Sequence, residues 1–377
     1  MIRFVTAGES HGMGLTAVIE GIPAGLKLDL QAINFDLRRR QLGYGRGLRM
    51  RIEQDTALIT AGVWDSVTIG APISIFIQNR DWKNWKDQAR PKRTVPRPGH
   101  ADLSAVLKYD FDDIQKAIER SSARETAART AIGAIAKQFL HAFGIVVYSH
   151  TRRIGNVVND QPVKFTPAKF RQIEKSPVRC ASPAAAKLMI REIDRAVTRQ
   201  DTLGGVSEVV VSGAPVGLGS YVQWDRRADV RLAAAVMGVQ SVKAIEIGTG
   251  ILASTQFGSQ VHDPILYNKS RGYHHRSNNA GGITAGITTG EEIILRAYFK
   301  PISTLGKPLP STDLKSRRPT DAPYVRSDIC VVPAGGVVCE AVVALTLADM
   351  LSEKFGGDSM REALANYRSY LRHVNQR

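Results

Sequence analysis

Short strand-like and helix-like segments follow one another along this chain without a strict strand–helix–strand rhythm. The strand-like segments are rich in Val, Ile and Thr and are bounded by Gly, Pro or Asp; they lie at residues 15–20, 57–63, 73–78, 206–212, 243–247, 283–287 and 292–298, with a shorter one at 2–6. The helix-like segments lie at 29–40, 122–143, 183–199, 227–240, 338–354 and 358–373. This order predicts a fold of the α+β class.

The segment 122–143 carries the clearest helix signals. It opens with Ser122-Ala-Arg-Glu125, the pattern of a capping box, and one apolar face can be formed by Ala127, Ile132, Ile135, Phe139 and Leu140. Asp29 is a candidate N-cap for 29–40, and Ser182-Pro183 places a cap before a proline at the first helical position. These signals predict where three helices begin.

Two pairs of short segments resemble each other about half a chain apart. Val18-Ile-Glu-Gly-Ile-Pro-Ala-Gly-Leu26 resembles Val210-Val-Ser-Gly-Ala-Pro-Val-Gly-Leu218, and Ile59-Thr-Ala-Gly-Val63 resembles Ile283-Thr-Ala-Gly-Ile287. Either the Gly-rich turns coincide by chance, or a strand-rich half of the chain is duplicated. No Pro/Ser-rich linker divides the sequence, which favours a single domain over residues 1–377.

Charge and composition limit the partners and the compartment. The 377 residues include 51 Lys and Arg against 35 Asp and Glu, and the net charge of +16 fits a nucleic acid, an anionic membrane surface or an anionic small substrate. The hydrophobic fraction of 43% argues against disorder. Three cysteines without a CxxC spacing indicate a reducing compartment. Since there is no apolar signal core and no run of eighteen apolar residues, we expect a cytoplasmic protein.

Five polar motifs in Gly-, Ser- or Pro-containing stretches could carry chemistry: Gly8-Glu-Ser-His-Gly12, the arginine-rich segment 38–51, Arg97-Pro-Gly-His100-Ala-Asp102, Arg120-Ser-Ser-Ala-Arg-Glu125 and Arg326-Ser-Asp328. Arginine binds phosphate and carboxylate in a bidentate way, and glycine lets backbone N–H groups approach an anion. Histidine exchanges protons near neutral pH, so His11 and His100 suit acid–base work. The motifs together indicate proton transfer around a multiply anionic substrate.

An RNA-binding protein is the competing interpretation. The RGG-like stretch within 38–51 and the tryptophans Trp82 and Trp85 among basic residues would then contact phosphates and bases. The same tryptophans could stack on a flavin ring or cover apolar surface. We expect no metal site, because His274 and His275 are adjacent and lack ligand spacing.

Three of the motifs lie in longer segments that resemble the chorismate synthase family: GESHGMGLTAVIEGIP at 8–23, ERSSARETAARTAIGAI at 119–135 and RSDICVVPAGGVVCE at 326–340. They follow the family's order over nearly the whole chain. The resemblance implies the last step of the shikimate pathway, a 1,4-anti elimination of phosphate from 5-enolpyruvylshikimate 3-phosphate that gives chorismate. It implies a carbon–oxygen lyase that needs reduced FMN without net redox change, and some members also reduce their own flavin with NADPH.

The resemblance also implies roles for individual residues. His11 would protonate or hydrogen-bond the reduced flavin, His100 would protonate the leaving phosphate, and Asp328 would help the flavin act as the base. The substrate's phosphate and carboxylates would be held by Ser10, Arg49, Arg97, Arg124 and Arg326. FMN would contact Ser122, Ala123, Arg124, Gln240, Ser241, Ala285, Lys300, Pro301, Ile302, Ser303, Thr304 and Arg326. Arg40 and Arg46 match positions assigned to NADPH in some members.

The family fold is a β–α–β sandwich with an internal pseudo-two-fold repeat, assembled as a homotetramer, and the resemblance implies the same architecture here. It also implies that the polar loops at 43–51, 79–101 and 303–326 become ordered around ligand. The chain departs from the family at two places. Gln240-Ser241 stands where Asn-Ala is usual and keeps a side-chain amide, whereas Ile329 replaces a proline and predicts a less rigid loop after Asp328.

Overall fold

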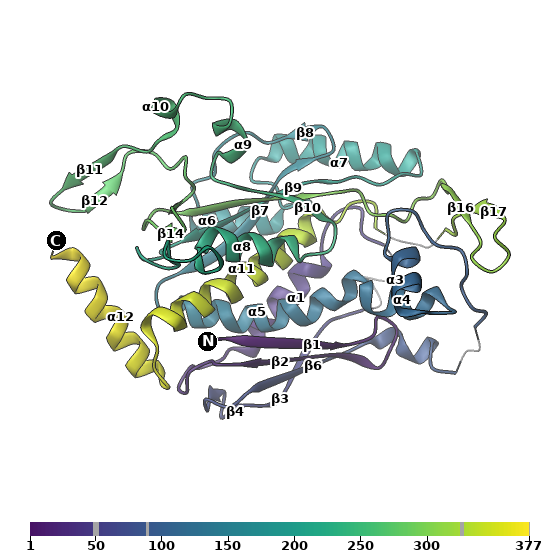
Figure 1. Ribbon diagram of the computed structural model, residues 1–377, viewed down its shortest axis with the longest axis horizontal. Coiled ribbons are helices and arrows are strands. Elements are labelled where there is room, and N and C mark those ends of the chain that lie inside the picture. The colour runs from purple at the N-terminus through teal and green to yellow at the C-terminus, as the bar shows by residue number, and fades with distance from the viewer. Residues whose placement is uncertain (48–52, 88–89, 325–327, 377) are drawn as a thin grey trace.

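The computed structural model of this chain describes residues 1–47, 53–87, 90–324 and 328–376. Two antiparallel sheets form its outer layers (Figure 1). The first sheet has the strand order β1 (Arg3–Gly8), β2 (Gly14–Glu20), β6 (Ile73–Gln78) and β3 (Ala57–Ala61). The second has the order β10 (Val242–Ile247), β15 (Ile293–Phe299), β9 (Gly205–Ser212), β7 (Val146–Ile154) and β8 (Val157–Val158). The chain therefore mixes helices and sheets, as the α+β class requires.

Three helices lie between the two sheets: α1 (Leu30–Gln41), α5 (Thr126–His141) and α11 (Val332–Phe355). Helix α5 packs on β2 and β6, whose alternate residues are buried, and α11 packs on β7 and β9. A Cβ on Gly133 would come within 2.4 Å of Ala341 Cβ, and a Cβ on Gly336 would come within 2.4 Å of Ser207 Oγ. Only glycine at these two positions lets α11 approach both α5 and the second sheet so closely.

The remaining elements surround these layers. The other helices are α3 (Asp102–Tyr109), α4 (Ile114–Ser121), α6 (Pro167–Lys175), α7 (Pro183–Thr198), α8 (Ala228–Met237), α9 (Gly250–Ala253), α10 (Gly258–Val261) and α12 (Met360–Asn375), with 3₁₀ turns η1 (Arg80–Asn84), η2 (Ala123–Glu125) and η3 (Trp224–Arg226). Four two-stranded hairpins pair β4 (Val63–Trp64) with β5 (Val67–Thr68), β11 (Ile265–Asn268) with β12 (Gly272–His275), β13 (Ile283–Thr284) with β14 (Ile287–Thr288), and β16 (Pro310–Thr312) with β17 (Pro319–Asp321).

All six helices expected from the sequence are present, and two of the three start signals act as expected. The Asp29 side chain accepts a hydrogen bond from Gln31 N (2.8 Å), and Ser182 accepts one from Ala185 N. The capping-box prediction at 122–125 is wrong. Ser122 ends α4 and caps the 3₁₀ turn η2, while the Glu125 carboxylate binds Thr6 and Arg129 instead of the Ser122 backbone.

Three other elements differ from the sequence expectation. Helix α11 begins at Val332, six residues before the expected 338, because its N-terminal turn is buried against the second sheet. Residues 283–287 form a hairpin with a turn at Ala285, where φ is 51°, rather than one strand. Strand β7 was not expected, because Ser149, His150 and Thr151 make it look polar although all three are buried.

The same hydrogen-bonded turn occurs after β2 and after β9. Leu26 N donates to Thr68 Oγ1 (2.9 Å), which donates to the carbonyl of Pro23 (2.6 Å). Leu218 N donates to Thr288 Oγ1 (2.8 Å), which donates to the carbonyl of Pro215 (2.6 Å). The two threonines close the hairpins 63–68 and 283–288. The structure therefore matches residue 63 with residue 283, whereas the sequence resemblance matches residue 59 with residue 283. The two alignments differ by four residues.

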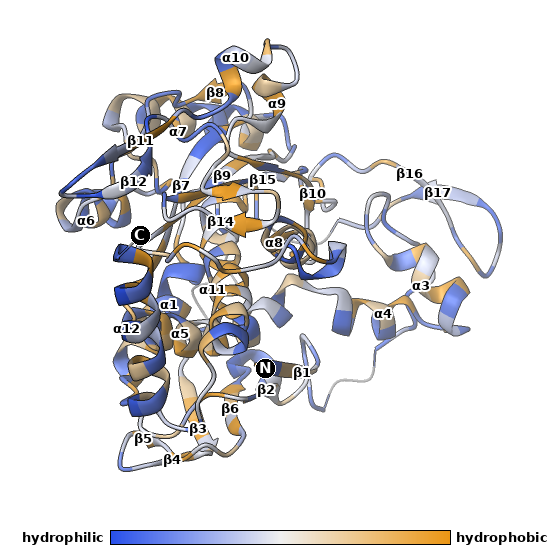
Figure 2. Cartoon of the chain, turned by 60° about the vertical axis from the view of Figure 1, so that its left-hand side comes forward, coloured by the Kyte–Doolittle hydropathy of each residue, from blue (hydrophilic) through white to orange (hydrophobic). Residues whose placement is uncertain are grey.

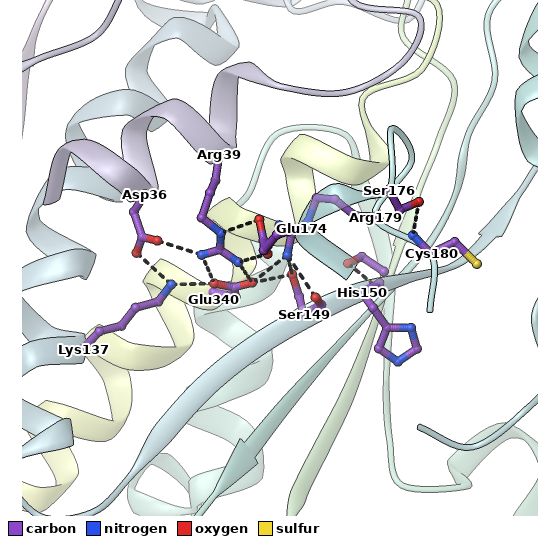
Figure 3. Close-up of polar contacts among 11 residues, drawn as sticks. Asp36, Arg39, Lys137, Ser149, His150, Glu174, Ser176, Arg179, Cys180 and Glu340 are labelled. Atoms are coloured by element: carbon purple, nitrogen blue, oxygen red, sulfur yellow. Dashed lines mark hydrogen bonds and ion pairs between the residues drawn. The ribbon is translucent and has the colours of Figure 1, made fainter. Parts of the chain in front are cut away.

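A buried ion network joins the central layers (Figure 3). Glu340 of α11 is fully buried and accepts hydrogen bonds from Arg39, Lys137, Arg179 and Ser149 at 2.5–3.1 Å. Burial alone would raise the pKa of Glu340, but Arg39, Lys137 and Arg179 outweigh that effect and hold the pKa well below its ordinary value. Asp36 and Glu174 balance the remaining positive charge. The network ties α1, α5, α6 and β7 to one carboxylate.

Helix α11 is long and apolar enough to cross a membrane by length and composition. Most of it is buried between α5 and the second sheet, and Figure 2 shows its orange, hydrophobic residues at the centre of the molecule. Its apolar character is therefore explained by the protein core.

Removing the charge at the centre of the network should cost stability. We expect Glu340→Gln to lower the free energy of unfolding by ~3–5 kcal/mol, because Arg39 and Lys137 would then be buried with too little negative charge. Since the pKa of Glu340 is lowered by folding, its contribution is present near neutral pH and is lost as the pH falls through the acidic range. Urea unfolding at several pH values measures both effects.

Glu353 is the matched control on the same helix. It pairs with Arg226 and Arg231 (2.8 Å each), but its side chain is 43% exposed. Glu353→Gln should change the free energy of unfolding by only ~0–1 kcal/mol. Equal effects of the two substitutions would contradict the central role of the network.

Candidate active site

The loop at 8–12 connects β1 to β2 and is held in place by Asn79, which directly follows β6. The Asn79 amide donates to the carbonyls of Glu9 (2.9 Å) and Gly12 (2.8 Å), and its oxygen accepts a hydrogen bond from Arg124 Nε (2.8 Å). Because β6 pairs with β2, the end of β6 lies beside the loop. One buried amide thus joins the first motif to the central motif.

Ser10 and His11 both face the end of α4. Ser10 is buried, and its hydroxyl lies 3.1 Å from Ser122 Oγ. His11 Nδ1 lies 2.9 Å from Glu119 Oε1, and the His11 backbone N–H donates to Glu119 Oε2 (2.7 Å). Burial would raise the pKa of Glu119, but its hydrogen bonds with His11 lower the pKa overall, so the carboxylate is ionised beside the imidazole.

Arg124 lies buried behind Ser122, among the acidic residues that precede β3. Its Nη1 contacts Asp55 (2.5 Å), and its Nη2 is 3.7 Å from Glu53 without a hydrogen-bond partner. Arg40 shares Asp55 (3.3 Å) and donates to the carbonyl of Ala123 (2.9 Å). Burial, with Arg124 and Arg46 nearby, lowers the pKa of Arg40 to about 10 although Asp55 opposes the shift. This part of the site is dehydrated, and Asp55 and Glu53 balance the two guanidinium groups, so the open Nη2 of Arg124 is the group that suits an anion.

A short series of contacts leads from the central motif to the second histidine. The Gln240 amide donates to Glu125 (3.3 Å), Ser241 accepts a hydrogen bond from the backbone N–H of Lys300 (2.9 Å), and Lys300 Nζ donates to the carbonyl of Gly99 (2.9 Å). Burial and the nearby Lys243 lower the pKa of Lys300. The loop at 97–102 is thus attached to the segment 300–304.

His100 shares a buried carboxylate with Arg97. His100 Nδ1 lies 2.5 Å from Asp102 Oδ1, and Arg97 contacts both oxygens of Asp102 through Nε (2.8 Å) and Nη2 (3.0 Å). Burial would raise the pKa of Asp102, but the hydrogen bonds from His100 and Arg97 hold the pKa well below its ordinary value. Asp102 therefore stays ionised next to both side chains.

Asp328 is held by the loop that follows α1. Arg46 Nη1 lies 2.9 Å from Asp328 Oδ2, and Gly47 N donates to Oδ1 (2.6 Å). The next residue, Ile329, donates its backbone N–H to the carbonyl of Gly45 (2.7 Å). The family's usual proline has no N–H to donate, so this hydrogen bond is specific to the isoleucine at this position. The less rigid loop that we expected after Asp328 stays a prediction.

Not all of the site residues expected from the sequence lie together in the structure. Arg49 and Arg326 lie outside the described residues. Ala285 lies in the β13–β14 hairpin beside α8, and Figure 1 shows that hairpin on the opposite side of the molecule from α3 and α4. Ser303 lines a small surface depression with Arg97 and Pro98, whereas Ile302 offers its carbonyl to Thr202 (2.8 Å). Pro301 and Thr304 flank these two residues in the same segment.

Several residues of the site had no assigned role in the sequence reading: Asp55, Asn79, Asp102 and Glu119. Asp102 and Glu119 lie inside quoted motifs, and the short spacing from His100 to Asp102 was an available signal. The spacing from His11 to Glu119, 108 residues, offered none. The Trp85 ring lies 3.8 Å from the His11 ring, centroid to centroid, so this tryptophan covers the histidine.

The residues fit an anionic, hydrogen-bonding cofactor such as FMN. Arg124 Nη2 is a buried donor without a hydrogen-bond partner, and Gln240 Oε1 is a buried acceptor in the same condition. A phosphate and a ring N–H would satisfy such atoms. Among the described residues, no group of three His, Cys, Asp or Glu side chains could hold a metal ion.

Comparisons with known proteins agree on one family. The family model described as "Chorismate synthase" matches residues 2–352. Proteins named chorismate synthase from Acidobacterium capsulatum and Geobacter sulfurreducens are 50% and 49% identical to this chain, over 100% and 99% of both chains respectively. A solved structure described as "Crystal Structure of Chorismate Synthase" is 40% identical, with a TM-score of 0.82 over 100% of this chain and 99% of that one.

Loss of the amide that joins the two motifs should loosen the site. In Asn79→Ala the carbonyls of Glu9 and Gly12 and the Nε of Arg124 lose a partner, and we expect a loss of ~1–3 kcal/mol in the free energy of unfolding. Backbone amides at 8–13 should exchange hydrogen faster. Urea unfolding and hydrogen exchange measure these effects.

Asn84 provides the control in the same segment. Its amide binds Asp81 on the surface, so Asn84→Ala should change stability by less than ~0.5 kcal/mol and leave exchange at 8–13 as it was. If Asn79→Ala behaved in the same way, Asn79 would not be the residue that holds this loop.

Proposed function

The chain belongs to the chorismate synthase family and is a lyase that converts 5-enolpyruvylshikimate 3-phosphate to chorismate and phosphate, and we propose that the residues around Ser10, His11, His100 and Arg124 perform this reaction. The observation that carries the proposal is the joining of two distant motifs, 8–12 and 119–125, through Asn79, Ser122 and Glu119. Such a meeting of loops at the ends of strands and helices is typical of catalytic sites.

The elimination breaks the bond between carbon and the phosphate oxygen and removes the proton at C6, so the products are chorismate and phosphate. The leaving phosphate needs positive charge and a proton. We assign these to Arg97 and His100, which share Asp102, with Lys300 attached through the carbonyl of Gly99. The protonated imidazole would donate at Nε2, because Nδ1 already faces the carboxylate.

Arg124 and Ser10 are the substrate-binding residues that the described contacts support best. Arg124 Nη2 offers a buried donor without a hydrogen-bond partner, and Ser10 is buried beside Ser122. Arg49 and Arg326 stay predictions from the sequence. An arginine that holds a substrate carboxylate or phosphate contributes ~2–4 kcal/mol to transition-state stabilisation.

We propose that reduced FMN is held by Ser122, Ala123, Arg124, Gln240, Ser241 and the segment 300–304. When bound there, reduced FMN would supply electron density for the elimination without a net redox change. His11 would hydrogen-bond the flavin, and Trp85 covers the imidazole ring of His11. Asp328 would be a polar neighbour of the flavin, held in place by Arg46 and Gly47. Arg40 makes its described contacts inside the protein, so an NADPH contact by Arg40 stays a prediction.

The finer architecture is part of the same proposal. The Thr68 and Thr288 turns support a pseudo-two-fold repeat within a β–α–β sandwich, and one continuous apolar core from Ile2 to Tyr367 supports a single domain. The outer face of the first sheet exposes Val5 and Leu58 by 67% and 60%, which supports burial of that face in a homotetramer. A cytoplasmic location fits an enzyme of small, soluble metabolites.

Both histidines should be needed for turnover but not for folding. We expect His11→Ala and His100→Ala to lose most phosphate release from 5-enolpyruvylshikimate 3-phosphate, by about 10²-fold or more each, because each removes a proton-transfer or hydrogen-bonding group at the reacting atoms. Both variants should still bind FMN. The measurement is an anaerobic assay with chemically reduced FMN, and flavin fluorescence reports binding.

The exposed His373 of α12 supplies the control, since His373→Ala should keep wild-type turnover. Near wild-type turnover in both His11→Ala and His100→Ala would refute the assignment. The same assay with NADPH alone tests for flavin reductase activity, and salt-dependent binding of RNA without any flavin requirement would favour the RNA-binding interpretation.

A further inference from the structure

Each of the two proposed catalytic histidines is joined through the same ring nitrogen to a carboxylate, which is buried in Asp102 and partly buried in Glu119. His11 Nδ1 faces Glu119, which belongs to α4, and His100 Nδ1 faces Asp102, which begins α3. The two histidines come from unrelated loops, so the common geometry is not a consequence of local sequence. We propose that Asp102 and Glu119 are positioning residues that hold His100 and His11 in the Nδ1–H tautomer, so that both rings exchange protons at Nε2.

The hydrogen bonds around Asp102 favour one tautomer of His100. Oδ2 accepts from the Arg97 backbone N–H (3.0 Å) and from Arg97 Nε (2.8 Å), and Oδ1 accepts from Arg97 Nη2 (3.0 Å). Guanidinium and backbone nitrogens only donate, so Asp102 must remain an acceptor at both oxygens. His100 Nδ1 lies 2.5 Å from Oδ1 and 3.1 Å from Arg97 Nη2, and that Nη2 also donates to Oδ1. Because Oδ1 is the nearer partner and acts as an acceptor, we assign the hydrogen to Nδ1.

Glu119 imposes the same condition on His11. Its Oε2 accepts from the His11 backbone N–H (2.7 Å), which is a fixed donor, and Oε1 faces both His11 Nδ1 and the amide of Gln115. Gln115 Nε2 also lies 3.4 Å from His11 Nδ1, but Glu119 Oε1 is nearer, at 2.9 Å. Most of the Glu119 carboxylate is shielded from water. The lowered pKa of Glu119 keeps this carboxylate ionised, so it acts as an acceptor. The backbone bond also fixes the side chain of Glu119 relative to the loop at 8–12.

The charges around the two rings differ, although their tautomers agree. Asp102 is neutralised by Arg97, with Arg93 and Lys300 as further cations near the loop. Glu119 has no such cation among its described contacts, which are with His11 and Gln115. The two carboxylates therefore share one function, orientation of a ring, within different electrostatic surroundings.

Carboxylate-to-amide variants test the inference because they reverse the hydrogen-bond pattern with little change in shape. In Asp102→Asn, the amide oxygen should turn to the two Arg97 donors that face Oδ2, so its NH₂ group meets His100 Nδ1. In Glu119→Gln, the oxygen should turn to the His11 backbone N–H, and NH₂ meets His11 Nδ1. Each change should convert only its own histidine to the Nε2–H tautomer.

The experiment is ¹⁵N NMR of the full chain with labelled histidine, recorded at about pH 9, where an ordinary imidazole is neutral. Signals of the two rings are assigned by their loss in His11→Ala and His100→Ala. We expect Nδ1–H for both rings in the wild type, a change of His100 alone in Asp102→Asn, and a change of His11 alone in Glu119→Gln. Turnover should fall by about 10- to 100-fold in each, with KM little changed.

Asp113→Asn is the matched control. Asp113 is a carboxylate of the same region that accepts hydrogen bonds from the backbone N–H groups of Arg93 and Gln115 and contacts neither histidine. Its substitution should leave both tautomers and turnover unchanged. Nε2–H rings in the wild type, or unchanged ring signals in Asp102→Asn and Glu119→Gln, would overturn the inference.

The roles of the rings in turnover rest on the proposed function, whereas the tautomers are measured without substrate or flavin. If His11→Ala and His100→Ala stayed active while the two amide variants changed the ring signals, the proposed function would fail and the positioning would stand. If the histidines proved essential while the amide variants changed neither signals nor turnover, only the positioning would fail.

Discussion

The carboxylate of Glu340 is the buried charge on which the arrangement of the central layers depends. An isolated carboxylate in the core would cost several kcal/mol, so cations from three different parts of the chain have to meet it: Arg39 of α1, Lys137 of α5 and Arg179 before α7. Ser149 of β7 completes its hydrogen bonds. The spacing of α1, α5, α11 and the second sheet is thereby set by one ionic cluster, together with the close helix approaches at Gly133 and Gly336.

The position of the active site follows from the same arrangement. Arg39 and Arg40 are neighbours on α1, yet Arg39 enters the ion network while Arg40 reaches Asp55 and the carbonyl of Ala123 in the central motif. The loop that follows α1 then supplies Arg46 and Gly47 to Asp328, just before α11. The core thus places the ends of α1, α5 and α11 next to the loops that carry the chemistry. Those loops are held mostly by single polar side chains, such as the buried Asn79 and the partly buried Glu119.

Much of this could be predicted from the sequence, and the exceptions have physical causes. The helices were recognisable because their apolar spacing and their caps are local signals, as at Asp29 and Ser182. Strand β7 was missed because two of its buried polar residues have partners far along the chain: Ser149 Oγ donates to Glu340, and His150 Nε2 lies 2.9 Å from Glu208. The Ser122 capping box was misread because Glu125 is used by Thr6 and Arg129, which no local pattern reveals.

The sequence by itself determined the family, the residue types of the site and most helix and strand positions, since these depend on contiguous motifs and periodic patterns. Only the tertiary structure decided which side chains meet. It joined Ser10 to Ser122 and His11 to Glu119 across more than a hundred residues, gave His100 and Arg97 a common carboxylate, and separated Ala285 from the rest. Hydrogen bonds between distant segments depend on packing in three dimensions, and one sequence carries no local record of that packing.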